Sequence, residues 1–497
     1  MTKLIRIIRN VLIAAFFVSL PVTSFPFFPP SFGGNSAVVR PLLVYPLLGL
    51  VILVTLPRFF SNPLSKPILI ILIFLLSAVI SSFIPYFRGI QSPWREVSVF
   101  ARELRTFITL SLAISIYLTV ALIPTSESDL QKTIRWMYMG LILVLVWGTF
   151  QAIYILGLIP GWFEVMNKIQ GFISTRGLYS TRVLGMTYEP TAFADQIVVI
   201  WLPFLLGASL TNFSVFAWRW KWVTLERFLF IWTMGILAFT LSRTGLIIGV
   251  GLILFGILLK LFDSIAVRRD IQGHSSSEYR GGAFQNIQPI HVLLVFLGIA
   301  IFMVSFYFLG TRSGYISRIW EYWDLTGDKD LWEYFTYIGF GSRIAYWRTA
   351  YHIYQEFPLL GVGLGNFTIY MPEMLPFQHL AKTPELLRHL VPRENGSRVL
   401  TAKHFLLRIL AETGLVGMGI FITFLLVLLA AGLYLWLSDD EGEHFWGTVS
   451  ILGVVAFVVD SFSFDSFAIP NPWIMFGMIT AAGRIFRARQ KTGEDSS

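Results

Sequence analysis

Long apolar runs alternate with short polar connections along most of this chain. A run of about 20 apolar residues is long enough for a helix to cross the roughly 30 Å hydrocarbon layer of a bilayer. The pattern predicts an all-α polytopic membrane protein with about twelve transmembrane helices. The runs lie at roughly residues 10–28, 41–57, 67–87, 104–124, 136–158, 193–211, 227–242, 244–263, 290–310, 414–437, 445–463 and 470–486.

Two longer polar segments separate these runs. Residues 311–403 form the long soluble stretch, and within it "SRIAYWRTAYHIYQEFP" predicts an amphipathic helix that has Ser342 as its N-cap and stops at Pro358. We expect the apolar side of this helix to lie on the membrane or on the helix bundle; its members are Ile344, Trp347, Tyr351 and Tyr354. Residues 264–289 are polar and rich in Gly and Ser, which predicts a flexible cytoplasmic loop.

The basic residues predict the orientation. With the N-terminus inside, the inner connections hold about twice as many Lys and Arg as the outer short loops, so the positive-inside rule places both termini in the cytoplasm. Residues 1–310 then hold transmembrane helices 1–9, residues 311–403 form an extracytoplasmic loop, residues 404–487 hold helices 10–12, and residues 488–497 form a cytoplasmic tail. The inner set is Lys3, Arg6, Arg9, Arg58, Lys66, Lys132, Arg135, Arg219, Lys221, Arg227, Lys260, Arg268, Arg269, Arg280, Arg484, Arg487, Arg489 and Lys491.

The amino-acid composition excludes several kinds of site and partner. Of the 497 residues, 55% are hydrophobic and 13% are charged, which is typical of an integral membrane protein. There is no cysteine, so disulfides, thiol nucleophiles and cysteine-ligated metals are excluded. The formal net charge of +9 is largely topological, and no basic stripe interleaved with aromatic residues predicts nucleic-acid binding.

Several cations lie at the predicted outer face, where the positive-inside rule disfavours them. Arg243 interrupts an apolar run in "AFTLSRTGLIIGVG", and a tight turn between two helices is the structural alternative. Arg182 lies near Glu189 and Asp195, with an interfacial ion pair as the alternative, and Arg343 opens the amphipathic helix, where it would otherwise be a solvated surface residue. A guanidinium forms forked hydrogen bonds to phosphate, so these residues predict a site for an anionic lipid-linked group such as pyrophosphate.

The stretch "HFLLRILAETGLVG" places a histidine at the same face. His404, Arg408 and Glu412 are spaced four apart, which puts them on one side of a helix that enters the bilayer. For Arg408 and Glu412 the favoured interpretation is an ion pair one turn apart.

Three other sequence patterns give only weak indications of a binding site. The stretch "GVGLGNF" lacks the spacing and the βαβ context of a dinucleotide loop. The triplet Asp328-Lys329-Asp330 offers a cation site, but its central lysine favours a solvated turn. The seven histidines lack metal-ligand spacing, so we expect no metal and no cofactor.

Four stretches, in this order, resemble the O-antigen ligase and O-antigen polymerase superfamily of bacterial polysaccharide enzymes: "RVLGMTYEPTAFA", "LSRTGLIIG", "SRIAYWRTAYHIYQEFPLLGVGLGNF" and "HFLLRILAETGLVG". The resemblance covers roughly residues 130–485. It implies a GT-C-like membrane architecture and an inverting, metal-independent glycosyltransferase in the bacterial inner membrane. The implied donor is a glycan on polyprenyl pyrophosphate, and the acceptor is a lipid or a second lipid-linked glycan.

The resemblance also implies roles for individual residues. Arg243 and Arg343 would bind the pyrophosphate with help from Arg182, and Arg408 would face the anion or Glu412. His404 would be the base toward the acceptor hydroxyl. Related proteins often carry a polar residue, commonly Asn, after this histidine, whereas Phe405 follows here, so Glu189 of "EPTAF" is the alternative base. Both ligase and polymerase remain open, with "EPTAF" more typical of the polymerase branch.

Two other classes of function stay in consideration. A membrane transporter of a small anion such as bicarbonate is the first alternative, although a carrier favours charges near the midplane of paired repeats, whereas the charges here gather at one face. A non-enzymatic scaffold for polysaccharide export is the second, and it would not require clustered arginines.

Overall fold

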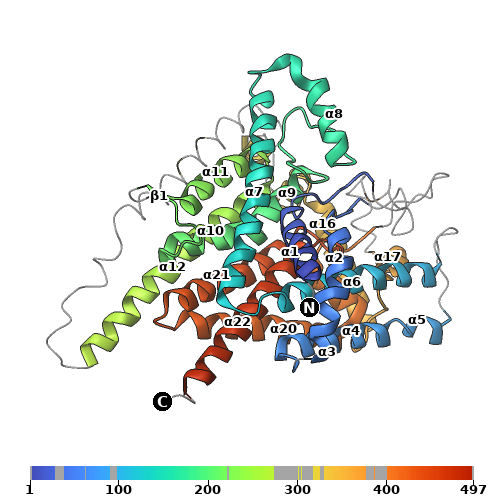
Figure 1. The fold of residues 1–497 in the computed structure, drawn as a ribbon. Helices are drawn as coiled ribbons and strands as arrows, with labels where there is room; N and C mark the ends of the chain where they lie inside the picture. Colours follow the sequence, from blue (N-terminus) through green and yellow to red (C-terminus); the bar gives the residue numbers. More distant parts are fainter. Residues whose placement is uncertain are drawn as a thin grey trace.

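The computed structural model describes most of the chain as a bundle of helices (Figure 1). It describes residues 3–27, 38–61, 63–89, 98–220, 223–273, 300, 304, 317–324, 330–375, 386 and 400–494.

In the first half of the chain, the described residues form helices and one short hairpin, joined by loops. Its helices are α1 (Lys3–Val18), α2 (Val44–Leu50), η3 (Val51–Thr55), α3 (Leu56–Ser61), α4 (Lys66–Ser81), α5 (Ile84–Phe87), α6 (Val99–Leu122), α7 (Glu127–Ile155), η4 (Pro160–Trp162), α8 (Phe163–Ile173), α9 (Pro190–Gln196), η5 (Ile197–Trp201), α10 (Leu202–Thr211), α11 (Leu225–Phe239) and α12 (Arg243–Gly273). Between α10 and α11, the strands β1 (Arg219–Trp220) and β2 (Val223–Thr224) pair antiparallel.

Among the described residues, the second half contains four shorter helices and then three long ones. These are α14 (Arg318–Asp324), α15 (Leu331–Tyr337), α16 (Gly341–Glu356), α17 (Phe367–Met374), α20 (Phe405–Trp436), α21 (Glu441–Asp460) and α22 (Asn471–Glu494).

Eight helical segments within the described residues are long and apolar enough to cross a membrane, so the chain is a multi-pass membrane protein. They are Val44–Ser61, Lys66–Phe87, Val99–Leu122, Glu127–Ile155, Pro190–Thr211, Arg243–Asp263, Phe405–Trp436 and Glu441–Asp460. Of the other predicted spans, α1 has 16 residues and α11 has 15, α22 ends in a charged stretch, and residues 290–310 lie almost entirely outside the described parts. The count of about twelve therefore stays a prediction.

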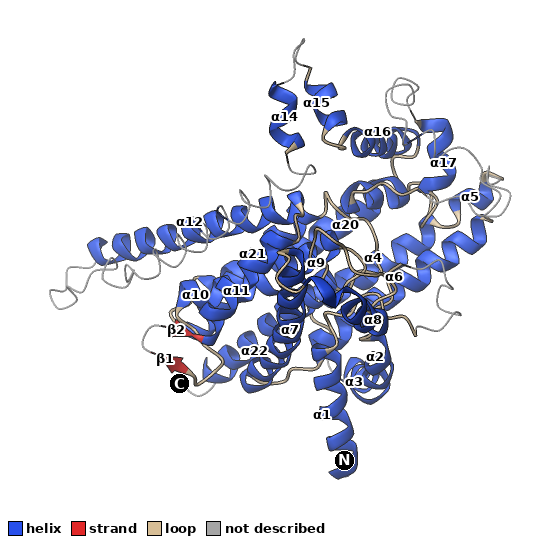
Figure 2. Ribbon diagram, turned by 90° about the horizontal axis from the view of Figure 1, so that it is seen from above, coloured by secondary structure: helices blue, strands red, loops and turns tan. Residues whose placement is uncertain are grey.

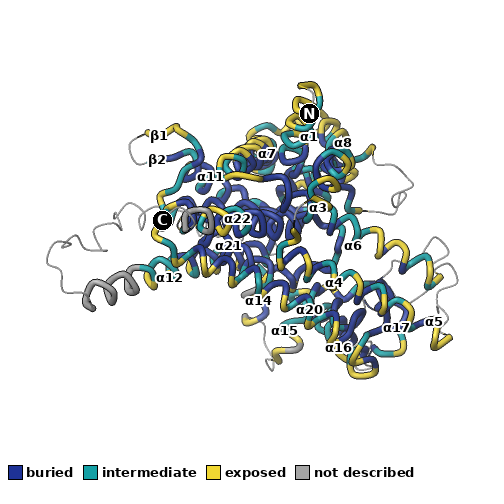
Figure 3. Tube along the Cα trace, turned by 60° about the horizontal axis from the view of Figure 1, so that its bottom comes forward, coloured by how far each residue is buried: buried dark blue, intermediate teal, exposed yellow. Residues whose placement is uncertain are grey.

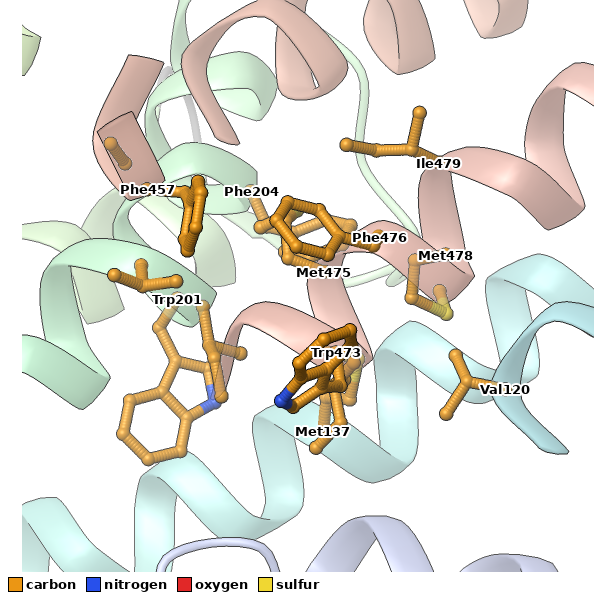
Figure 4. Packing of buried hydrophobic residues seen from close by; sticks show 14 of the residues in the cluster. Val120, Met137, Trp201, Phe204, Phe457, Trp473, Met475, Phe476, Met478 and Ile479 are labelled. Carbon is orange, nitrogen blue, oxygen red and sulfur yellow. The ribbon is translucent and has the colours of Figure 1, made fainter. Parts of the chain in front are cut away.

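Two spans form the interior of the bundle. In Pro190–Thr211 and Glu441–Asp460, 89% and 78% of the spanning window is buried, against 28–50% in the other six spans. Figure 3 shows this buried region around α21 and α22. Large apolar side chains from several helices meet there, among them Trp201, Phe204, Phe457, Trp473 and Phe476 (Figure 4). Spans covered on all sides are held by close packing, whereas the outer helices present apolar residues to lipid.

The helices of the predicted soluble segment lie together. Figure 2 shows α14, α15, α16 and α17 along one edge of the molecule, away from both chain termini. Within this group, α16 packs on both α17 and α20. The candidate Arg343 lies on α16 at this edge.

Two local predictions were wrong. The predicted loop at 264–289 begins too early, because helix α12 continues to Gly273. The amphipathic helix begins at Gly341 after Phe340, so Ser342 lies inside the helix rather than at its N-cap.

The buried side of α16 also differs from the expected one. It consists of Ser342, Ala345, Tyr346, Thr349, Ala350 and Ile353, while Tyr351 is exposed. Mostly small side chains on that side allow α16 to lie close to α20. This packing decides which side is buried, in place of the aromatic side that the sequence predicted.

Helix α20 is broken at Gly414, whose φ is 62°, and the loop after α16 docks on the break. Val362 N and Gly363 N donate to the carbonyl oxygens of Ala411 and Glu412 at 3.1 and 2.9 Å. In return, Leu415 N and Val416 N donate to the carbonyl oxygens of Pro358 and Leu359 at 2.8 and 3.1 Å. The stretch "PLLGVG" therefore replaces the helical hydrogen bonds that the break removes.

Candidate functional site

His404 lies at the N-cap of α20, in a pocket of aromatic rings. Its ring centroid is 4.3 Å from that of Phe462 and 5.3 Å from that of Trp347 on α16, and the residue is only 5% exposed. Burial lowers the pKa of His404 from its ordinary 6.5 to about 4, and the Asp465 carboxylate offsets part of this shift. The imidazole is therefore neutral at pH 7. Its Nδ1 is buried and has no hydrogen-bond partner among the described residues.

The next residue, Phe405, packs in the core of the helix bundle. Phe405 is fully buried and packs against Phe421, Phe457, Phe464 and Phe467. Its backbone N–H donates to the carbonyl of Ser461 at 2.8 Å. The aromatic side chain at this position thus anchors the start of α20 in the core.

Arg343 shares a loop with His404. Its Nη1 donates to the carbonyl oxygens of Phe462 and Ser463 at 3.1 and 3.3 Å. Because the ring of Phe462 contacts His404, the guanidinium and the imidazole approach the same short stretch of backbone. Far from being only a solvated surface residue, Arg343 is half-buried and bonded to this loop.

Arg243 and Arg182 meet at the turn between α11 and α12. Arg243 is the first residue of α12, so the tight-turn interpretation of its position is confirmed. Its Nη1 donates at 2.7 Å to the carbonyl of Ile338, just before α16. Arg182 Nε donates at 2.8 Å to the carbonyl of Thr240, in the same turn. Carbonyl bonds thus orient both guanidinium groups.

A cluster of carboxyl groups lies beneath the arginines. Glu189 is half-buried at the N-cap of α9 and has the extended backbone that Pro190 predicts, with φ −160° and ψ 157°. Asp195 and Asp460 line one small pocket and interact electrostatically with each other. The charge of Arg343 acts on both.

Sequence reasoning missed Asp460. The signal was present, since an aspartate ends the apolar run "GVVAFVVD", and ionisable residues beside a span are functional candidates. Its proximity to Asp195 was not readable from the sequence, because the two residues lie on different helices.

The predicted ion pair one turn into α20 is present. Arg408 Nε lies 3.1 Å from Glu412 Oε1, and Arg408 Nη1 donates to the carbonyl of Asp465 at 2.6 Å. Arg408 is only 8% exposed. This arrangement ties α20 to the loop that follows α21, and it favours a supporting role for Arg408 over direct contact with a ligand.

The candidate residues are therefore connected because they contact the same backbone segments. Arg182 and Arg243 hold the α11–α12 turn, Arg243 and Arg343 flank the start of α16, and Arg343 and His404 share the 462–463 loop. No group of three or more His, Cys, Asp or Glu that could hold a metal ion occurs in the described parts of the chain. Asp328 lies outside the described residues, so the triplet at 328–330 stays untested.

Comparisons with known proteins bear on the family. Residues 228–422 match the family model described as O-antigen ligase. The matched segment runs from α11 into α20 and contains Arg243, Arg343, His404 and Arg408, whereas Arg182 and Glu189 precede it. No curated protein matches the chain. The match gives no support to the small-anion transporter. Residues 228–422 of this chain are thus similar to the O-antigen ligase family, and the match supports the resemblance to the O-antigen ligase and polymerase superfamily.

Proposed function

We propose that this protein is an inverting glycosyltransferase of the O-antigen ligase or polymerase type, which transfers glycan from a polyprenyl-pyrophosphate donor at the extracytoplasmic face of the bacterial inner membrane. The acceptor is a membrane lipid or a second lipid-linked glycan. One observation supports the proposal: three arginines and one neutral histidine come from segments far apart in the sequence. They lie at the α11–α12 turn, at the start of α16 and at the start of α20.

The arginines suit a pyrophosphate leaving group. As the bond between the anomeric carbon and the phosphate oxygen breaks, negative charge grows on the departing polyprenyl pyrophosphate. Guanidinium groups that backbone carbonyls already orient can stabilise this charge without reorganising during the reaction. Arg243 and Arg343 are the proposed main contacts, with Arg182 beside them and Arg408 supporting the site from behind.

His404 suits the role of base. In a single inverting displacement, the acceptor oxygen bonds to the anomeric carbon while its hydroxyl proton moves to a protein group. A neutral imidazole with an unpartnered nitrogen can accept that proton, although a pKa of about 4 makes it a weaker base than an exposed histidine. Glu189 is the alternative base, and no metal or cofactor enters this scheme.

Arginine-to-lysine exchange tests the anion site. Lysine keeps the charge but loses the forked geometry, so Arg243→Lys and Arg343→Lys should each lower transfer on the order of 10²-fold. Mass spectrometry of lipid-linked intermediates and surface glycans, in a deletion strain complemented with each variant, measures this. Intermediates should accumulate with both variants but not with the control Arg348→Lys, an exposed position on the same helix.

Two results would count against the proposal. Full complementation by both lysine variants removes the arginines from the anion site. A deletion strain with unchanged lipid-linked intermediates and surface glycans removes the glycosyltransferase function itself.

A further inference from the structure

A second pocket lies at the opposite end of the helix bundle from the candidate site. It encloses about 590 Å³ and is lined by α1, α3, the end of α6, and the first turns of α7. Helix α6 links the two regions: Arg102, near its start, donates to the carbonyl of Gly365, whereas Ile123, just past its end, lines this pocket. A helix of 24 residues is about 36 Å long, so about one bilayer thickness of helix separates the pocket from Arg102, which interacts electrostatically with Arg408.

The pocket is strongly basic. Its lining includes Arg9, Arg58, Lys132 and Arg135 but one carboxylate, Asp129, which leaves a formal charge of +3 from four cations and one anion. Arg58 interacts electrostatically with both Arg9 and Asp129. Like charges held together in one pocket repel, and an anionic ligand would relieve this repulsion.

Two of the cations are held in place. Arg58 Nη1 donates to the carbonyl oxygens of Leu122 and Ile123 at 2.5 and 2.6 Å. Arg135 Nε donates to the carbonyl of Val215 at 2.7 Å. Arg9 adds a buried Nε that has no hydrogen-bond partner among the described residues. The positive-inside rule accounts for cations near this end of the bundle, but it does not account for guanidinium groups fixed around one pocket.

One wall of the pocket is apolar and continues onto the outer surface of the bundle. Trp136 and Met139 line the pocket and are 38% and 47% exposed. Ile13, Val54 and Phe216 add further apolar lining. Charge at one side and an exposed apolar wall at the other match an amphiphile better than a free anion.

From this charge and apolar lining we propose that the pocket binds an anionic phospholipid, with the phosphate headgroup among Arg9, Arg58, Lys132 and Arg135 and the acyl chains along Trp136 and Met139. Basic pockets between transmembrane helices are suited to anionic headgroups at the cytoplasmic side. The proposal does not depend on the glycosyltransferase function.

Lipid binding to the purified full-length protein in detergent tests this. Native mass spectrometry compares phosphatidylglycerol with phosphatidylcholine, each titrated into the wild type and into Arg9→Gln/Lys132→Gln. Each removed cation should weaken phosphatidylglycerol binding about fivefold, so the pair should weaken it roughly 25-fold. Arg58 and Arg135 are left intact, because they bond to backbone carbonyls.

The matched control is Arg6→Gln/Arg219→Gln, which removes two exposed cations from the same predicted face but outside the pocket lining. Its affinity for phosphatidylglycerol should match the wild type. As a gain-of-affinity variant, Asp129→Asn should bind the lipid more tightly, which keeps the proposal testable if the double variant fails to fold.

Four outcomes would overturn the proposal. Equal binding of the two lipids removes selectivity for anionic lipid, and equal losses in both double variants indicate a diffuse surface charge. Displacement of phosphatidylglycerol by millimolar inorganic phosphate would identify a free-anion site instead. Unchanged affinity in both Arg9→Gln/Lys132→Gln and Asp129→Asn would place the lipid elsewhere.

Discussion

Two properties of His404 bear on its proposed role as the base. It is a neutral imidazole held between Trp347 and Phe462, and one of its ring nitrogens is buried without a partner among the described residues. Removing a general base typically lowers a rate on the order of 10²–10⁴-fold. We therefore expect His404→Ala to lower turnover by this factor, with donor binding largely intact, and Glu189→Gln to cost less.

Turnover and donor binding have to be measured separately in this comparison. Complementation followed by quantification of surface glycan gives the first, and retention of lipid-linked donor on the purified variant gives the second. If Glu189→Gln is inactive while His404→Ala keeps most of its turnover, the roles are reversed and His404 is structural.

The pH dependence of the reaction follows from the environment of His404. Burial lowers its pKa to about 4, so the imidazole stays unprotonated at every pH above that value. If His404 is the base, kcat/KM should stay high as the pH falls through 6.5 and should decline only near pH 4, because this parameter reports the pKa of the free enzyme.

Lowering the pH from 6.5 to 4 should also reduce the stability of the fold. Between pH 6.5 and 4, the unfolded chain binds a proton at His404 that the folded chain does not, so stability falls as the pH falls. A pH–rate profile corrected for inactivation, with His404→Gln as the control, separates the two effects. An acid limb centred near 6.5 would contradict the buried environment assigned to this residue.

At the level of single residues, the sequence predicted the cations but not their partners. Arg182, Arg243 and Arg343 were recognisable because a charge beside an apolar run is costly and therefore informative. Their carbonyl partners at Thr240, Ile338 and Phe462 depend on contacts between distant segments, and no local pattern encodes them. The Asp195–Asp460 pair was missed for the same reason.

At the level of elements, the break in α20 carries the most specific sequence motifs. The loop at 358–363 and the helix at 411–416 exchange backbone hydrogen bonds, which explains why glycines recur in "PLLGVGLG" and "LAETGLVG". The loop is also fixed to α6, since Asn366 Nδ2 donates to Glu103 Oε1 at 2.7 Å. These motifs hold His404 and α16 in register, although they contain none of the candidate catalytic residues.

Adding one methyl group at this junction should therefore disrupt the site from a distance. Gly361 has a φ of 67°, and a Cβ there would lie 2.5 Å from the carbonyl carbon of Glu412. Gly361→Ala should lower the unfolding free energy by roughly 1–3 kcal/mol and reduce transfer activity. Thermal unfolding of the purified variant and complementation measure the two effects.

Gly419→Ala is the matched control, because Gly419 lies in the same helix with open space around its Cβ position. It should leave activity unchanged and stability equal or slightly higher. A stable and active Gly361→Ala variant would show that the loop can leave the helix without consequence.

The lengths of the apolar runs predicted where helices occur, but they did not predict which side of a helix is buried. The spans at 66–87, 99–122 and 190–211 lie close to the predicted runs, because about 20 apolar residues have few alternatives in a bilayer. Helix α16 is not an apolar span of this kind. Its partner is α20 rather than lipid, so small residues face inward and Tyr351 is exposed.

At the level of the whole molecule, the two ends of the bundle have different chemistry. One end gathers Arg182, Arg243, Arg343 and His404 beside α16, and the other gathers the cations of the second pocket. Helix α6 runs from one end to the other. Such an arrangement suits an enzyme that reacts with lipid-linked substrates at one membrane face only.

The orientation of these ends in the membrane is the last prediction. We expect residues 311–403 outside and both termini in the cytoplasm, because the basic residues of the short connections gather at the end opposite to α16. The chain contains no cysteine, so single cysteines can be introduced without a background. Leu331→Cys on α15 and Asp439→Cys between α20 and α21 both lie at exposed positions on opposite predicted sides. In spheroplasts, a membrane-impermeant maleimide should label the cysteine at 331 directly and the cysteine at 439 only after permeabilisation. The reverse labelling pattern would place the arginine site in the cytoplasm and would exclude an extracytoplasmic reaction.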